Sequence, residues 1–125
     1  MSTPESIRTR DDQALVFDNG IATFAVESRD TYIVVRVGGE LDISSRDAHT
    51  IVLEQVAQDL KTRPGREVVV DLREVQFCDS TGIVLLLRLQ CETDEAGVGF
   101  LVRDPSSAVS RVLIAGGLHD LLDPR

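Results

Sequence analysis

Short apolar segments separated by turn-forming residues occupy the first third of the chain. Residues 14–17, 21–27 and 32–37 are mostly apolar or β-branched, and turns such as Asp18-Asn19-Gly20 lie between them. Strands joined by turns this short pair antiparallel. We therefore expect an antiparallel meander with residues 14–17 as an edge strand. The Gly38-Gly39 pair is expected to break the third strand.

An amphipathic helix follows these strands. Apolar residues recur at three- and four-residue intervals from Ala48 to Leu60, which is the period of one buried helix face. The Ser44-Ser45 pair supplies candidate N-caps, and Arg63-Pro64-Gly65 is a stop signal. Residues 67–72 then hold Val68, Val69, Val70 and Leu72, a nearly continuous apolar run that is typical of a strand buried on both faces.

The last third of the chain continues to alternate between helix and strand. We expect a helix from Asp79-Ser80 to about residue 93, a strand at 97–102, a helix from Pro105 to Gly116-Gly117, and a short strand at 118–122. This order implies right-handed parallel crossovers. The predicted fold is therefore a single α/β domain, with a mixed β-sheet that has parallel crossover strands and packed α-helices.

Length and composition also indicate one domain. The chain has 125 residues, of which 42% are hydrophobic, and this suffices for one core. Residues 1–12 are polar and charged, so we interpret them as a flexible leader that precedes a domain at 13–125. A net charge of −8 and few aromatic side chains argue against direct binding of nucleic acid.

Targeting signals and cofactor motifs are absent from the sequence. No apolar stretch is long enough to span a membrane, and the N-terminus is unlike a signal peptide, so a cytoplasmic protein without a membrane partner is expected. The cysteines lack metal-ligand spacing, and no metal or cofactor is predicted. Cys91 lies roughly 16 Å along a helix from Ser80, so a disulfide with Cys78 is not expected.

The most informative segment opens the second predicted helix. Asp79 is placed to cap this helix, which puts Ser80 in the first turn beside unpaired backbone N–H groups. Capping alone is one interpretation, because Asp, Ser and Thr are common at helix starts. A phosphoacceptor is the other, because a helix N-terminus accommodates the roughly −1.5 to −2 charges of a phosphate.

Five consecutive apolar residues at 83–87 follow this segment. A helix that packs on one sheet buries only one stripe of side chains. Some of Ile83, Val84, Leu86 and Leu87 therefore either face outward near Ser80, where they would serve an interface, or are covered by neighbouring helices.

Two separated motifs give the chain a resemblance to STAS domains, in particular to bacterial anti-anti-sigma factors. Gly-Glu-Leu-Asp stands at 39–42 after an early strand. Asp-Ser-Thr-Gly stands at 79–82 at a helix start, in a segment that begins with Asp71 in the preceding strand. Gly117-Leu118 is a weaker third feature. The resemblance covers about residues 20–122, and the order of the motifs is that of the family.

The resemblance implies a phosphoprotein that regulates transcription by partner switching, an anti-sigma factor antagonist, and not an enzyme. In the family, the unphosphorylated protein binds an anti-sigma factor that is also a serine kinase, and this frees a sigma factor. The kinase then phosphorylates the antagonist, and a serine phosphatase resets the switch. Carried over to this chain, the phosphorylated serine is Ser80. The expected partner contacts are Asp42, Asp79, Thr81, Gly82 and Ile83.

Other interpretations stay open or are disfavoured. A structural STAS subunit of a transport or signalling assembly would share the fold without phosphorylation. Ser-His catalysis, with His49 or His119 as the base, is disfavoured, because a hydrolase nucleophile turn needs glycine where Cys78 stands. Family members usually continue into a C-terminal helix, whereas this chain stops at Arg125, so the oligomeric state is not predicted.

Overall fold

The computed structural model of the chain describes residues 6–10 and 14–117. Its helices and strands, in chain order, are β1 (Ser6–Arg10), β2 (Ala14–Asp18), β3 (Ala22–Ser28), β4 (Tyr32–Leu41), the 3₁₀ turn η1 (Ile43–Ser45), α1 (Arg46–Thr62), β5 (Glu67–Cys78), α2 (Ser80–Ala96), β6 (Phe100–Arg103) and α3 (Ser107–Ala115). The strands form one sheet in the order β1 to β6. Pairing is antiparallel from β1 to β4 and parallel from β4 to β6. The predicted mixed α/β fold is confirmed.

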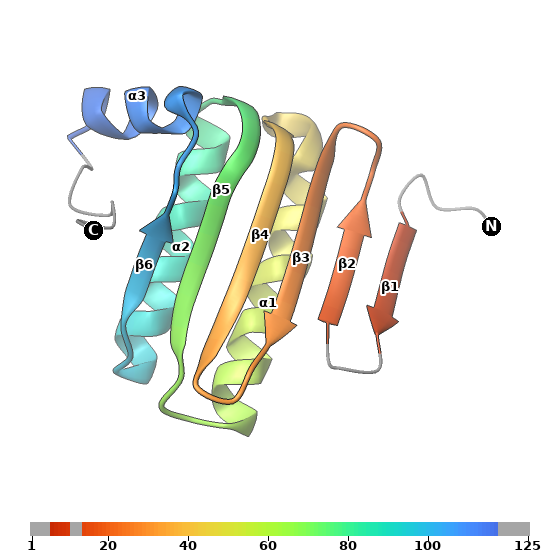
Figure 1. The fold of residues 1–125 in the computed structure, drawn as a ribbon, viewed down its shortest axis with the longest axis vertical. Helices are drawn as coiled ribbons and strands as arrows, with labels where there is room; N and C mark the ends of the chain where they lie inside the picture. The colour runs from red at the N-terminus through yellow and green to blue at the C-terminus, as the bar shows by residue number, and fades with distance from the viewer. Residues whose placement is uncertain (1–5, 11–13, 118–125) are drawn as a thin grey trace.

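Helices α1 and α2 lie side by side across one face of the sheet (Figure 1). Val35 of β4 lies opposite Val70 of β5, and both are fully buried in the same core as Val52 of α1 and Leu86 of α2. Each helix connects two parallel strands, so both helices begin at the carboxyl end of the sheet (Figure 1). This topology brings the two sequence motifs to one edge of the molecule.

The N-terminal segment corrects one expectation. Residues 6–10, which the sequence placed in a flexible leader, form β1 and pair with β2 along their whole length. Strand pairing uses backbone groups, so a polar segment joins a sheet wherever a neighbouring edge is available. Because β2 is flanked by β1 and β3, the prediction that residues 14–17 form an edge strand is also wrong. The domain boundary at residue 13 stays a prediction.

The glycine pair at 38–39 does not end the third predicted strand, because β4 continues to Leu41. The register with β5 shifts on both sides of this pair, so the glycines form an irregularity inside a longer strand. Gly39 has φ +85°, and a Cβ there would collide with the backbone oxygen of Ile21. Strand β5 likewise runs past residue 72 to Cys78, since the longer β4 supplies it with a partner.

The remaining boundaries differ by a few residues. Helix α2 continues beyond residue 93 to Ala96, so β6 begins at Phe100 and not at residue 97. Val69 of β5 is buried as well as its neighbour Val70, which confirms that this strand is covered on both faces. The strand predicted at 118–122 lies outside the described residues.

The two cysteines are both free and occupy different environments. Cys78 is buried at the end of β5, whereas Cys91 is exposed on α2. Burial, together with the charge of Asp79, raises the pKa of the Cys78 thiol to about 11. Cys78 packs as a small apolar side chain in the core.

Replacing Gly39 with alanine is expected to cost about 2 kcal/mol or more of unfolding free energy. The added Cβ would face both the positive φ and the Ile21 carbonyl. Gly20→Ala is the matched control, because Gly20 has φ +84° but nothing within 4 Å of an added Cβ. Urea unfolding measures both costs. An equal loss in the two variants would contradict the close packing at Gly39.

The thiols are expected to react in two distinct phases. At about pH 8, a disulfide-exchange reagent should modify Cys91 quickly in the native protein, while Cys78 stays protonated and buried and reacts only after denaturation. Absorbance of the released thiolate measures both phases. The Cys91→Ser variant should lose the fast phase. A fast phase that persists in that variant would show that Cys78 is accessible.

Candidate functional site

The candidate site lies where β4 and β5 end. Leu41 and Cys78 are the last residues paired between these parallel strands, so Asp42 and Asp79 follow from adjacent positions. The Asp79 backbone N–H donates to the Leu41 carbonyl oxygen at 3.1 Å, which ties the start of α2 to the end of β4. The two motifs, 37 positions apart from Asp42 to Asp79 in the chain, thereby share one edge of the sheet.

Asp42 is anchored by the 3₁₀ turn η1 that follows it. Its side chain accepts hydrogen bonds from the Ser44 backbone N–H at 2.9 Å and from the Ser44 hydroxyl. These bonds stabilise the charged form, so the pKa of Asp42 is lowered from its ordinary value. Asp42 is therefore an ionised carboxylate beside the start of α2.

At the start of α2, Asp79 caps the helix and Ser80 is exposed. The Asp79 side chain accepts from the Thr81 backbone N–H at 2.8 Å and caps the helix, as the sequence predicted. Ser80 is the first helical residue and is exposed, and no hydrogen bond of its hydroxyl is found among the described residues. The capping interpretation therefore accounts for Asp79 and leaves the Ser80 side chain without a structural task.

Gly82 allows α2 to approach the sheet closely. A Cβ at this position would lie 2.6 Å from the Cys78 sulfur and 3.0 Å from Leu41 Cβ. Gly82 is buried by this contact. The resemblance implied a partner contact for Gly82, but its burial gives it a packing role, because a partner cannot reach it without moving the helix.

The apolar run in α2 is partly buried and partly exposed. Leu86 is fully buried and Ile83 is half-buried, whereas Val84 is 47% exposed and Leu87 is 36% exposed. Val84 and Leu87 lie four and seven residues after Ser80, so they share its face of the helix. The run thus has both outward-facing and covered residues, and an interface at the exposed ones stays a prediction.

Three further apolar side chains at this edge were missed from the sequence. Ile43 follows Asp42 and is 67% exposed, and Phe77 precedes Cys78 and is 49% exposed. Ile21 is exposed too, in a turn whose carbonyl accepts the Glu40 N–H at 3.1 Å. The only signal in the sequence was apolar residues beside polar turn residues. Exposed apolar side chains of this size are common at protein interfaces.

His49 lies beneath the site and was considered from the sequence only as a catalytic base. Its Nε2 lies 2.9 Å from the Ser45 hydroxyl, and its ring packs edge-on against Phe24. Burial lowers the pKa of His49 from its ordinary value, although the charges of Asp79 and Asp42 oppose this shift. His49 is therefore a neutral, hydrogen-bonded side chain at neutral pH.

The part of the chain that the structure describes contains no group of three or more side chains placed to hold a metal ion. Within the same residues, no helix is long and apolar enough to cross a membrane. The geometry at this edge is that of an exposed hydroxyl surrounded by carboxylates and apolar side chains.

Comparison with curated proteins finds relatives that share most of this chain. An anti-sigma F factor antagonist of Paenibacillus polymyxa is 29% identical over 90 residues, which cover 72% of this chain and 74% of the relative. An anti-sigma-B factor antagonist of Staphylococcus aureus is 28% identical over 96 residues, which cover 76% of this chain and 84% of the relative.

Solved structures share the fold. An anti-sigma factor antagonist from Mycobacterium paratuberculosis has a TM-score of 0.67 at 27% identity, and the match covers 94% of this chain and 92% of that one. The anti-sigma factor antagonist SpoIIAA in its unphosphorylated form has a TM-score of 0.66 at 22% identity, covering 80% and 85% of the two chains. At this identity, the similarity to SpoIIAA shows a shared fold and no more.

A family model settles the classification. The model described as "Mlab, STAS domain" matches residues 24–123. This span contains both motifs, the two helices that begin at the site, and the parallel part of the sheet. The chain therefore belongs to the STAS-domain family.

Proposed function

We propose that this protein is an anti-sigma factor antagonist switched by phosphorylation of Ser80. The unphosphorylated form binds an anti-sigma factor that is also a serine kinase, and this frees a sigma factor. Phosphorylation of Ser80 weakens the complex, and a serine phosphatase restores the binding form. The names of the relatives support the class of partner.

One observation carries the proposal: Ser80 is exposed at the first position of α2, and its side chain has no hydrogen bond within the described residues. A kinase can reach such a hydroxyl without unfolding the helix. The cap on α2 comes from Asp79, so modification of Ser80 removes no stabilising contact. The switch can therefore act on the surface while the fold is kept.

The surroundings of Ser80 make a phosphate there effective against a bound partner. Phosphate adds roughly −1.5 to −2 charges at neutral pH. The helix N-terminus stabilises part of this charge, but Asp79 and Asp42 already make the edge negative. A partner that had to bury the phosphate beside these carboxylates would lose binding energy through repulsion and desolvation.

The partner surface in this proposal surrounds Ser80. Asp42 and Asp79 supply carboxylates, and half-buried Thr81 and Ile83 form its floor. Exposed apolar side chains add the contact area that a stable interface needs, and they are Ile43, Phe77, Val84 and Leu87. The protein acts as an adaptor in this scheme, and catalysis belongs to the kinase and the phosphatase.

Substitution at Ser80 tests the switch. Ser80→Ala should bind the cognate anti-sigma factor kinase within about twofold of wild type and accept no phosphate, because the hydroxyl makes no structural bond. Ser80→Asp should weaken binding about tenfold or more. Isothermal titration calorimetry measures the affinities, and labelled ATP with mass spectrometry locates the phosphate.

Ser107 offers a matched control. It is also an exposed serine at the first position of a helix, α3, and is capped by the neighbouring residue Ser106. Ser107→Asp should leave binding unchanged. Normal phosphorylation of Ser80→Ala, or equal binding by Ser80→Asp and wild type, would contradict the switch. The latter result would favour a structural STAS subunit that works without phosphorylation.

A further inference from the structure

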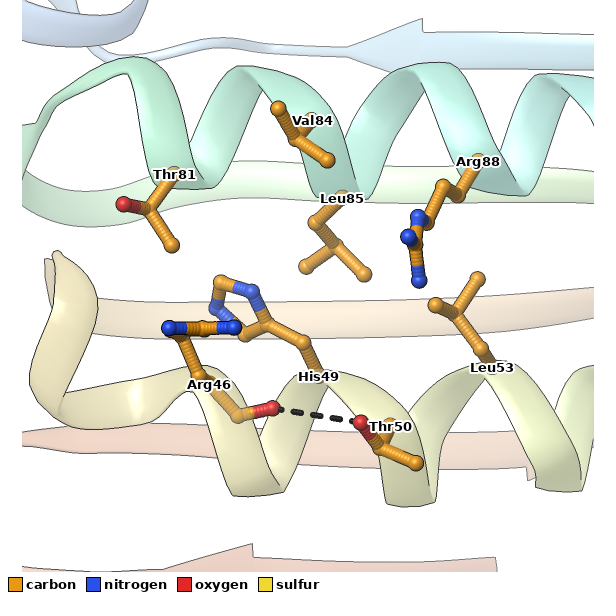
Figure 2. Close-up of a pocket in the computed structure, with 8 residues that line it drawn as sticks. All are labelled: Arg46, His49, Thr50, Leu53, Thr81, Val84, Leu85 and Arg88. Atoms are coloured by element: carbon orange, nitrogen blue, oxygen red, sulfur yellow. Dashed lines mark hydrogen bonds between the residues drawn. The ribbon is translucent and has the colours of Figure 1, made fainter.

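A groove lies between α1 and α2, directly beside the start of α2 (Figure 2). It encloses about 150 Å³, which is room for one or two side chains and too little for a whole helix. Both helices line it along their first turns. The lining residues that bear on its chemistry are Arg46, His49, Leu53, Thr81, Val84 and Arg88.

The charge of this groove is opposite to that of the whole molecule. The chain carries 21 acidic residues and a net charge of −8, yet no acidic residue of the part that the structure describes lines the groove, and two arginines do. Neither Arg46 nor Arg88 forms an ion pair with any described residue. Arginines left without a carboxylate in so acidic a chain are available to an external one.

The two charges stand at opposite ends of the groove. Arg46 is the first residue of α1, and Arg88 is the ninth residue of α2. Both helices start at the same edge of the sheet, so the two positions are roughly 12 Å apart along the helix direction. Figure 2 shows Val84 and Leu85 between them on the α2 side. The groove therefore has an arginine at each end and apolar side chains in the middle. Beyond Arg88 it adjoins a hollow that Glu54 and Glu92 also line.

His49 adds hydrogen bonding but no charge to the Arg46 end. The Ser45 hydroxyl donates to the Asp42 carbonyl oxygen at 2.8 Å, so it accepts the hydrogen bond from His49 Nε2–H. This arrangement leaves Nδ1 of the neutral ring as an acceptor. The positive charge of the groove thus belongs to the two arginines alone.

We propose that the groove receives a segment of the partner protein that carries two carboxylates about 12 Å apart with an apolar side chain between them. Acidic residues about seven or eight positions apart on one helix satisfy this spacing. Each carboxylate would pair with an arginine, and the apolar side chain would enter between Leu53 and Val84. The partner is the anti-sigma factor kinase, so this inference rests on the proposed function.

The groove also explains how a phosphate on Ser80 would weaken partner contacts that Ser80 itself does not make. Ser80 precedes Thr81, which lines the groove at the Arg46 end. A phosphate there repels the carboxylate paired with Arg46, whereas Arg88 lies two helical turns further on. The effect of phosphorylation should therefore depend on Arg46 more than on Arg88.

The test compares three charge-removing variants against the cognate anti-sigma factor kinase. Arg46→Met and Arg88→Met should each weaken binding about five- to thirtyfold and reduce its salt dependence. Arg111→Met, an exposed arginine on α3, should bind as wild type. Urea midpoints check that each variant is folded. Adding Ser80→Asp to Arg88→Met should weaken binding as much as it does in the wild type. Adding it to Arg46→Met should weaken binding by a smaller factor.

A charge exchange sharpens the test. Arg88→Glu should bind poorly, and changing one acidic residue of the kinase to arginine should restore its binding. Weak binding by Ser80→Asp with unchanged binding by both groove variants would overturn this inference and leave the proposed function standing. Failure of wild type to bind the kinase at all would overturn both.

Two other ligands could occupy the groove, and evidence for either of them would also overturn the inference. If sodium phosphate alone saturates the groove, seen as amide shifts of residues along it, and displaces the kinase, the groove is a simple anion site. If the arginine variants change the sedimentation of the protein alone and not its affinity for the kinase, the groove holds a second copy of this chain.

Discussion

The parallel pairing of Leu41 with Cys78 is the constraint on which the site depends. Side by side, the ends of β4 and β5 deliver Asp42 and Asp79 to neighbouring positions, although the chain between them forms a whole helix and strand. The Asp79 N–H bond to the Leu41 carbonyl then continues the pairing into the start of α2. Gly82 completes the junction, because only a residue without a Cβ lets α2 approach Leu41 and Cys78 so closely.

This junction separates the groups that hold the site from those that face a partner. Gly82 and the Ser45–His49 bond anchor the helix starts below the surface, and half-buried Asp79 both caps α2 and reaches the surface. Ser80 lies above them with an exposed hydroxyl. A charged group attached there changes the surface potential without removing a contact of the fold, which is what a reversible switch requires. Because β4 and β5 end side by side, α1 and α2 begin at the same edge of the sheet, and the groove lies between them.

Local patterns predicted much of this architecture. The three- and four-residue spacing from Ala48 to Leu60 predicted α1, and the valine run of β5 predicted a strand covered on both faces. The sequence failed where pairing partners decide the outcome. Residues 6–10 form β1 because β2 offers an edge, and β4 continues through the glycine pair because β5 pairs beyond it. Backbone hydrogen bonding of this kind has no signature in side-chain pattern.

By itself, the sequence determined the alternation of elements and the cap at Asp79, because these depend on residues within a few positions of one another. The two separated motifs at 39–42 and 79–82, through the family that they resemble, made Ser80 the candidate switch. Only the tertiary structure decided which apolar residues of α2 are exposed, that Gly82 is buried, and that Arg46 and Arg88 line one groove. These properties depend on how two helices far apart in the chain are placed by the sheet between them. That placement is set by long-range strand register, which neither helix encodes alone.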